Sequence, residues 1–182
     1  ETPEFERSGL SAPTGAVFLD ESHLYIVNYN NNNSVVVDVT GNDEPVTILQ
    51  GGMNGIQGPD IGLAVDFQRR VYVPGFDSST IVRAPLNGDG PVDRIVSSGG
   101  GGLDAPRAVL LNENNDLLVT SWRNDRILRF DAETGAARGV FSTAVTRPTS
   151  MIYRNADELL VASDNTNSCL LYTSDAADES CS

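Results

Sequence analysis

Four pairs of side chains recur along the chain at intervals of roughly 40–50 residues, each directly after a short apolar run. An aromatic ring can stack on a sugar ring or a peptide, and a neighbouring polar group can orient that ligand through hydrogen bonds. We therefore take the pairs as candidate ligand-binding residues: Tyr29 and Asn30, Phe76 and Asp77, Trp122 and Arg123, and Asp164 and Asn165.

The recurrence also fits a second interpretation, in which the rings pack between neighbouring repeat units as part of the core. Regular repetition favours this interpretation, because stacked units reuse the same packing residues. A ligand site normally breaks the repeat, and Arg123 and Asp164 are the clearest breaks. Both interpretations place the four pairs at equivalent positions in the fold.

The side chains most used in catalysis are scarce in this chain. His23 is the single histidine and lies in a polar turn, and the two cysteines are Cys169 and Cys181. They assemble neither a Ser-His-Asp or Cys-His arrangement nor a His/Cys metal site. The Asn-Gly-Asp-Gly turn at 87–90 lacks the ligand series of a calcium loop. We therefore predict no metal site and no cofactor, and the catalytic residues stay unknown.

A repeated unit must position the candidate pairs, and a proline marks its start. The prolines are Pro13, Pro59, Pro106 and Pro148. Each precedes two short apolar runs separated by a polar turn, and then a loop that carries one candidate pair. A third run, a Gly-bearing turn and a fourth run complete the first three units. Short runs rich in Val, Ile, Leu and Tyr, bounded by Gly, Asn and Asp, are typical of strands.

The sequence therefore predicts an all-β fold, a β-propeller fragment with about three complete four-stranded blades and the first half of a fourth. We expect a lead-in at 1–7 and a partial propeller at 8–168, with blades at about 8–50, 51–98, 99–143 and 144–168. The first strands start at Ala16, Gly62, Ala108 and Ser150, which bring no carboxylate to the central channel.

The third unit resembles an NHL-type repeat, through the segments at 103–109, 116–122 and 126–131. The wider group contains six-bladed propellers of the gluconolactonase and streptogramin-lyase kind. The resemblance covers roughly residues 8–168 and implies ligand binding where the strand 2–3 and strand 4–1 loops converge. Because this fold also hosts lactonases, lyases and plain binding modules, the resemblance implies architecture more than function. Gluconolactonase-like enzymes hold a metal with Glu, Asp and Asn, so a divalent cation is implied only for an enzyme.

Residues 169–179 resemble a peptide encoded by a sequencing-library adapter read in frame, as in a metagenomic-type sequence. The resemblance implies that the folded repeat ends near Ser168 and that 169–182 is an added tail. In the alternative interpretation, 169–172 forms the third strand of the fourth blade, since its apolar residues match those at 127–130. The length of the match favours the adapter.

The formal net charge is −13, and all twelve basic residues are arginine. Such a surface repels phosphates and anionic lipids, which argues against nucleic acid and membrane-surface partners. No apolar run is long enough for a membrane span. A propeller fragment leaves two apolar blade faces exposed, so we expect these faces to self-associate. We also expect an exported protein, secreted or periplasmic.

Two functions are compatible with these observations. The first is a non-enzymatic NHL-like propeller module that binds a small molecule, a glycan or a protein at its loop face. The second is a fragment of a propeller enzyme, a lactonase-like hydrolase or a lyase, whose catalytic residues lie mostly in further blades. A carboxylate or histidine that faces the channel would favour the enzyme.

Overall fold

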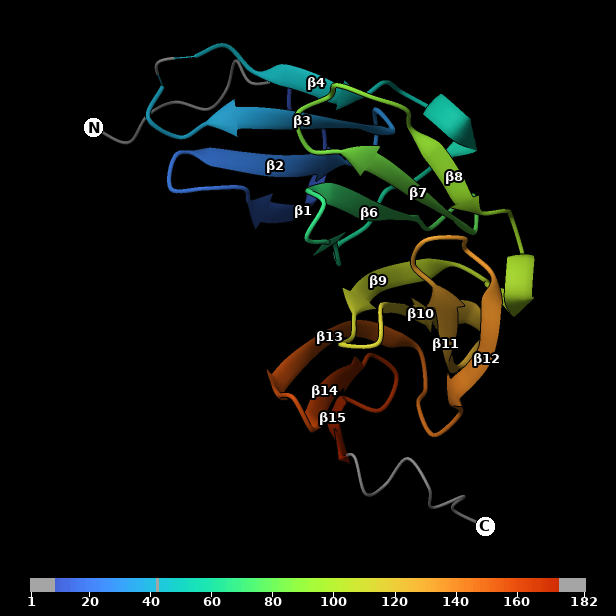
Figure 1. The fold of residues 1–182 in the computed structure, drawn as a ribbon. Helices are drawn as coiled ribbons and strands as arrows, with labels where there is room; N and C mark the ends of the chain where they lie inside the picture. The colour runs from blue at the N-terminus through green and yellow to red at the C-terminus, as the bar shows by residue number, and fades with distance from the viewer. Residues whose placement is uncertain (1–8, 42, 174–182) are drawn as a thin grey trace.

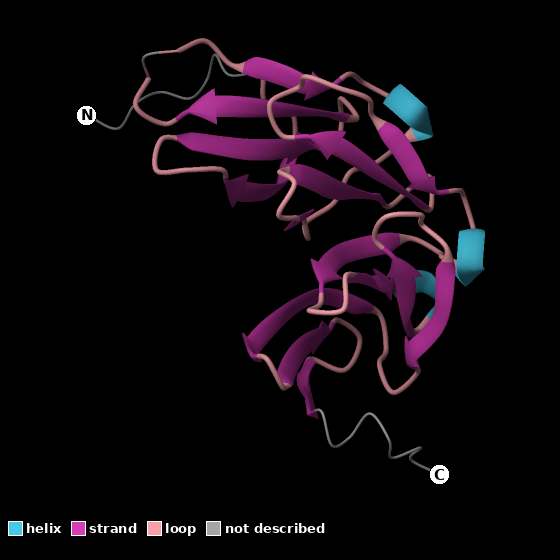
Figure 2. Ribbon diagram, viewed as in Figure 1, coloured by secondary structure: helices cyan, strands magenta, loops and turns pink. Residues whose placement is uncertain are grey.

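The computed structural model describes residues 9–41 and 43–173, and most of its regular structure is β-strand (Figure 1, Figure 2). The strands form four antiparallel sheets in which neighbours in sequence are neighbours in the sheet. The first sheet contains β1 (Pro13–Phe18), β2 (His23–Asn28), β3 (Asn33–Asp38) and β4 (Val46–Leu49). The second contains β5 (Ala64–Val65), β6 (Arg70–Gly75), β7 (Thr80–Pro85) and β8 (Asp93–Val96). The third contains β9 (Pro106–Leu111), β10 (Asp116–Ser121), β11 (Arg126–Asp131) and β12 (Ala137–Ser142), and the fourth β13 (Pro148–Asn155), β14 (Glu158–Ser163) and β15 (Ser168–Thr173).

The sheets follow one another along an arc, with β1, β9 and β13 toward its concave side and β4, β8 and β12 toward its convex side (Figure 1). This is the arrangement of β-propeller blades, so the predicted fold class is confirmed. The predicted lead-in at 1–7 and Cys181 lie outside the described residues. No helix among the described residues is long and apolar enough to cross a membrane.

The fourth sheet extends further than the sequence predicts. Its expected end was Ser168, yet residues 168–173 form β15, which pairs with β14 from Ser163↔Ser168 to Glu158↔Thr173. Alternate side chains of β15, those of Leu170 and Tyr172, pack against the third sheet. Whatever the origin of this segment, its alternating apolar pattern is sufficient to complete a third strand.

Among the described residues, three short 3-10 turns lie between strands: η2 (Met53–Gly55), η3 (Gly100–Gly102) and η4 (Trp122–Asn124). The first two lie between one sheet and the next, while η4 lies in the β10–β11 loop. Gly101 in η3 has a positive φ of 62°, and a Cβ there would lie 2.7 Å from Phe130 Cε1. Glycine is therefore required where this connection crosses the edge of the third sheet.

Neighbouring sheets pack face to face because side chains alternate along each strand. In β6, Val71 and Val73 pack toward the first sheet, whereas Tyr72 packs toward the third. The same alternation in β10 directs Leu117 toward the second sheet and Leu118 toward the fourth. Each buried side chain of this size stabilises the fold by about 1.5–3 kcal/mol. Sheets two and three are thus covered on both faces.

The inner strands of neighbouring sheets also touch through their backbones. Gly62 N donates to Arg107 O at 3.0 Å, and Val109 N donates to Gly62 O at 3.1 Å. A Cβ on Gly62 would lie 2.3 Å from Ala108 Cβ, so only glycine allows this approach. The sequence predicts a first strand from Gly62 in this unit, but β5 spans only Ala64–Val65 because Gly62 bonds to the next sheet instead.

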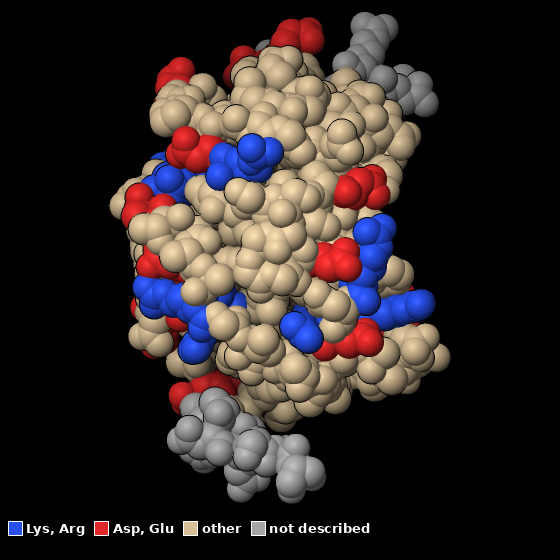
Figure 3. Space-filling model, turned by 90° about the vertical axis from the view of Figure 1, so that its right-hand side faces the viewer, with Lys and Arg blue, Asp and Glu red and all other residues tan. Residues whose placement is uncertain are grey.

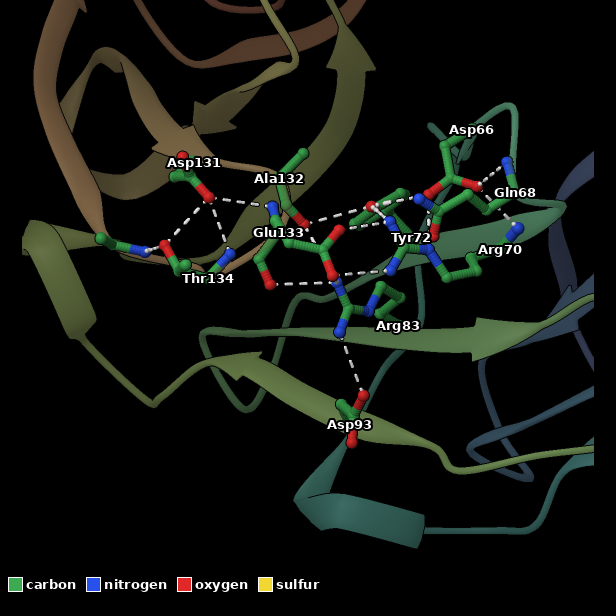
Figure 4. Close-up of polar contacts among 11 residues, drawn as sticks. Asp66, Gln68, Arg70, Tyr72, Arg83, Asp93, Asp131, Ala132, Glu133 and Thr134 are labelled. Atoms are coloured by element: carbon green, nitrogen blue, oxygen red, sulfur yellow. Dashed lines mark hydrogen bonds and ion pairs between the residues drawn. The ribbon is translucent and has the colours of Figure 1, made fainter.

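A polar network joins the second and third sheets at the end of β6 where the β5–β6 turn lies (Figure 4). The Arg70 guanidinium donates to Asp66 Oδ2 at 2.6 Å and to Glu133 Oε2 at 2.7 Å. Arg83 bridges from Asp93, at 3.1 Å, to the Ala132 and Glu133 carbonyls. On the convex side, acidic and basic side chains are interspersed and no large region carries one sign (Figure 3).

Candidate functional site

The four candidate pairs lie at equivalent positions, in the loops after the second strand of each sheet. The first residue of each pair donates its backbone N–H to the carbonyl of the residue before the repeat proline. These bonds are Tyr29 to Ala12 at 3.0 Å, Phe76 to Gly58 at 2.8 Å, Trp122 to Ala105 at 3.2 Å and Asp164 to Arg147 at 3.1 Å. The four carbonyl residues share positive φ angles between 46° and 58°. The backbone of the repeat therefore fixes where each candidate pair begins.

The first two loops meet through a hydrogen bond between side chains. Tyr29 Oη donates to Asp77 Oδ2 at 2.7 Å. This bond to a carboxylate raises the pKa of Tyr29, so the phenol remains a donor at neutral pH. Gly58 lies against both side chains: a Cβ at this position would come within 2.5 Å of Asp77 Oδ2 and 2.9 Å of Tyr29 Cε2.

The second and third loops meet through their aromatic rings. The centroids of Phe76 and Trp122 are 5.8 Å apart, with the rings tilted by 59°. This spacing is within the range of favourable aromatic pairs, which stabilise by about 0.5–1.5 kcal/mol beyond burial. Both rings remain partly accessible. The two rings thus contact each other across neighbouring blades and remain partly accessible to solvent.

Three arginines surround these rings. The guanidinium of Arg123 lies 5.5 Å from the Phe76 centroid and that of Arg107 lies 5.8 Å from it, while that of Arg147 lies 4.8 Å from the Trp122 centroid. Each is within cation–π range, and a guanidinium held on a ring keeps in-plane N–H donors for another partner. Asp60 Oδ2 accepts from Arg107 Nε at 2.8 Å. We call Tyr29, Asp60, Phe76, Asp77, Arg107, Trp122, Arg123 and Arg147 the loop-face cluster.

The structure brings five of the eight sequence candidates into this cluster: Tyr29, Phe76, Asp77, Trp122 and Arg123. The other three, Asn30, Asp164 and Asn165, are exposed. Among the residues that the structure describes, no side-chain hydrogen bond or ring contact joins these three to the cluster.

Sequence reasoning missed Asp60, Arg107 and Arg147. Asp60 is only 4% exposed and lies two residues before Gly62, one of the four predicted first-strand starts. Their position next to the repeat proline could have identified these three residues. Asp60 and Arg107 directly follow Pro59 and Pro106, and Arg147 directly precedes Pro148. Thr14 occupies the position of Asp60 in the first unit, and its hydroxyl donates to Pro59 O at 2.8 Å.

His23 lies at the opposite end of the strands; the sequence predicts it in the β1–β2 turn, and the structure places it directly after that turn, as the first residue of β2. Its Nδ1 is 2.9 Å from Asp20 Oδ1, and this hydrogen bond raises the pKa of the imidazole. In the described part of the chain, no group of three or more His, Cys, Asp and Glu side chains could hold a metal ion.

A hollow of about 360 Å³ also lies at that opposite end, between the third and fourth sheets. It is lined by Leu111, Asn112, Glu113, Asn114, Tyr153, Asn155 and Ala156. A smaller hollow of about 130 Å³ adjoins it and shares Tyr153 and Ala156. The residues that line the larger hollow come from β9, β13 and the turns that follow them, and none belongs to a candidate pair.

Comparisons with known proteins identify the fold. No family model matches the chain, and no curated protein matches it in sequence. A catalytically inactive variant of virginiamycin B lyase from Staphylococcus aureus, solved with quinupristin, matches with a TM-score of 0.72 at 15% identity, over 91% of this chain and 53% of that one. A protein of unknown function from Bacteroides thetaiotaomicron matches with a TM-score of 0.68 at 18% identity, over 91% of this chain and 42% of that one. A streptogramin B lyase matches with a TM-score of 0.64 at 13% identity, over 90% of this chain and 55% of that one.

The matches support the β-propeller fold and extend along nearly the whole chain. At these identities they show the fold alone. The chain spans about half of the length of these proteins.

Proposed function

We propose that this chain is a β-propeller module that binds a ring-bearing polar ligand at the loop-face cluster. The observation that carries the proposal is the meeting of Phe76 and Trp122, two partly accessible rings from neighbouring sheets, 5.8 Å apart. A core ring would be buried by its neighbours. These two rings are partly accessible instead, and polar and charged side chains surround them. The ligand would therefore span at least two blades.

The chemistry of the cluster suits a sugar or a short peptide. Ring faces supply stacking for a sugar or a peptide plane, worth about 0.5–1.5 kcal/mol for each contact. Arg123 and Arg147 supply N–H donors for ligand oxygens, and hydrogen bonds to charged groups contribute about 1.5–3 kcal/mol. The Tyr29–Asp77 pair can exchange its internal bond for one to a ligand hydroxyl. The summed free energy of a few such contacts, reduced by the entropy lost on association, predicts a moderate affinity.

Trp122 is the single tryptophan of the chain, so its fluorescence reports directly on the cluster. We would titrate the protein with neutral oligosaccharides and with short peptides while recording Trp emission. Binding at the cluster should change the emission in a saturable manner, and Phe76→Ala should weaken binding by about tenfold, or about 1.4 kcal/mol.

Phe67→Ala is the matched control, because Phe67 is fully exposed in the β5–β6 turn, at the other end of the strands. The control should bind as the wild type does. If both variants bind equally well, or if no probe changes the emission, binding at the cluster is ruled out for these ligand classes.

The second candidate function is a fragment of a propeller enzyme, a lactonase-like hydrolase or a lyase. Similarity to two lyase structures favours it at the level of fold, and the buried Asp60 supplies one carboxylate near the first-strand starts. Most catalytic groups would then lie in further blades. A divalent cation belongs to this candidate, so a thermal shift with Ca²⁺, Mg²⁺ or Zn²⁺ would support it, and no shift would weaken it.

A further inference from the structure

Arg147 breaks the repeat at the position before the repeat proline. In the first three units this position holds a small residue: Ala12, Gly58 and Ala105. All four residues have a positive φ, which is 46° for Arg147. The same left-handed backbone therefore forms without a long side chain, and the arginine is not needed to build this connection. Its side chain is available for another role.

The main chain of Arg147 is fixed on both sides of the residue. Its backbone N–H donates to Asp125 Oδ1 at 2.7 Å, and its carbonyl accepts from Asp164 N at 3.1 Å. Its guanidinium lies 4.8 Å from the centroid of the Trp122 ring, which belongs to the third sheet's loop. The side chain is thus positioned both by its main chain and by the ring, which reduces the entropy that a ligand would lose by ordering it.

Arg147 differs from the other two arginines of the loop-face cluster, because both of those have an acidic partner. Arg107 Nε lies 2.8 Å from Asp60 Oδ2, and Arg123 Nη1 lies 3.5 Å from Asp104 Oδ1. In the part of the chain that the structure describes, Arg147 forms no ion pair and no side-chain hydrogen bond. The residue is exposed, and a guanidinium stacked on a ring keeps its N–H donors in its own plane. These donors are therefore accessible to a ligand.

We propose that the ligand of the loop-face cluster carries a carboxylate, and that Arg147 binds this carboxylate through paired N–H···O hydrogen bonds. The inference rests on the proposed function and adds the charge of the ligand to it. The two oxygens of a carboxylate match the parallel donors of a guanidinium, and such charge-assisted bonds are stronger than neutral ones. A uronic acid sugar and the C-terminus of a peptide both supply this group.

The charge of the cluster favours a carboxylate over a phosphate. With Arg107 and Arg123 already beside carboxylates, Arg147 is the cation of the cluster whose charge is not balanced by an ion pair. A singly charged group balances it. The chain as a whole carries a formal net charge of −13, which repels a doubly charged phosphate more strongly than a carboxylate.

The cluster also has two chemically different ends, which predict the orientation of the ligand. Tyr29 and Asp77 lie where the loops of the first two sheets meet, and they present a hydroxyl and a carboxylate. Arg123 and Arg147 lie on the rings of Phe76 and Trp122. A ligand whose carboxylate binds Arg147 would therefore direct hydroxyl or ammonium groups toward Asp77.

Calorimetric titration of the full chain with matched pairs of ligands tests the proposal. One pair is a disaccharide that ends in glucuronate and its methyl ester, and the other is Gly-Phe-Gly with a free C-terminal carboxylate and its C-terminal amide. The members of a pair share the same ring and differ in the charged group. We expect the acid of one pair to bind at least about tenfold more tightly than its neutral partner. The pair that shows this preference identifies the source of the carboxylate.

Arg147→Gln should remove the preference, weakening the acid about tenfold more than the neutral ligand. The side chain is exposed, so the variant should fold, and a thermal melt checks this. Arg154→Gln is the control matched for net charge, because Arg154 is 65% exposed near the other end of β13. It should keep the wild-type ratio between acid and neutral ligand.

The outcomes separate this inference from the proposed function. If acid and neutral ligands bind equally, and Phe76→Ala still weakens both, the carboxylate is wrong while the proposed function stands. A preference that survives Arg147→Gln, or that Arg154→Gln also removes, would overturn the role of Arg147. Competition by inorganic phosphate as strong as that by the acid would overturn the choice of a carboxylate. If no member of either pair binds, and neutral oligosaccharides do not bind either, both proposals fail.

Discussion

At the scale of single residues, the loop-face cluster depends on side chains placed by close backbone packing. Asp60 and Arg107 come from neighbouring sheets, and the carboxylate of Asp60 is buried while it accepts from Arg107. Removal of Arg107 is costly, because it leaves the buried Asp60 carboxylate without its guanidinium partner. The pair therefore holds Arg107 at a fixed position beside Phe76, where the proposed ligand would stack.

Gly58 provides a test of this packing. Its φ of +58° already disfavours a side chain, and a Cβ would collide with Asp77 and Tyr29. Gly58→Ala should lower the free energy of unfolding by about 1–3 kcal/mol and should weaken ligand binding. Urea denaturation and the fluorescence titration measure the two effects.

Gly52→Ala separates strain from collision, because Gly52 has a φ of +73° but nothing within 4 Å of an added Cβ. Gly52→Ala should lower the free energy of unfolding by about 1 kcal/mol, because it adds backbone strain without a steric collision. Equal losses in the two variants would show that the space around Gly58 is not used by the cluster.

At the scale of elements, the network between the second and third sheets makes their packing sensitive to acid. A hydrogen bond from Arg70 lowers the pKa of Glu133 in this network. Within the third sheet, backbone and side-chain hydrogen bonds from Thr134 lower the pKa of Asp131 to about 2. A carboxylate with a lowered pKa in the folded state stabilises the fold above its unfolded pKa of about 4. This contribution is lost as the pH falls through the folded pKa.

We therefore expect the urea midpoint to fall steadily between about pH 4 and pH 2, with little change from this source above pH 5. Glu133→Gln should make that dependence shallower by removing one titrating group, and Glu44→Gln, at an exposed loop position, should leave it unchanged. The prediction fails if the wild type and Glu133→Gln have parallel pH profiles.

The strand pattern was largely readable from the sequence because it is local. The run at 46–49 is β4 itself, and the fourth run of the third unit falls within β12. Where the strand bounds differ from the expected ones, contacts between units are the reason. Gly62 bonds to the next sheet instead of extending β5, and the apolar alternation at 168–173 adds a strand to the fourth sheet.

The candidate site was readable only in part, for the same reason. Tyr29, Phe76 and Trp122 stand out because they recur at one position of the repeat. Arg107 and Arg147 do not recur, and only the folded structure shows that their guanidinium groups lie on rings from other units. A contact between residues far apart in sequence leaves no local pattern to find.

At the scale of the whole molecule, the stack of sheets should be most stable at its centre. Sheets two and three are covered on both faces, while the fourth sheet has a free face and, among the described strands, a free edge along β15. In a stack where each unit contacts only its neighbours, terminal units open first. Hydrogen exchange at low protein concentration should therefore be slower in β6 and β10 than in β14.

Protein concentration provides the control for this experiment. The order of protection should be the same at every dilute concentration, because it arises within one copy of the chain. Equal protection of β6, β10 and β14 at the lowest concentration would contradict a stability that decreases toward the end of the stack.

The backbone bond that begins each strand 2–3 loop has a consequence for variation at the binding surface. Tyr29, Phe76, Trp122 and Asp164 are held by the same N–H to carbonyl contact, whatever side chain each carries. Because the main chain alone sets these four positions, mutation can exchange the side chains without rebuilding the loops. One scaffold could in this way acquire new ligands through a few substitutions, and a library randomised at these positions would be a practical starting point for selecting binders.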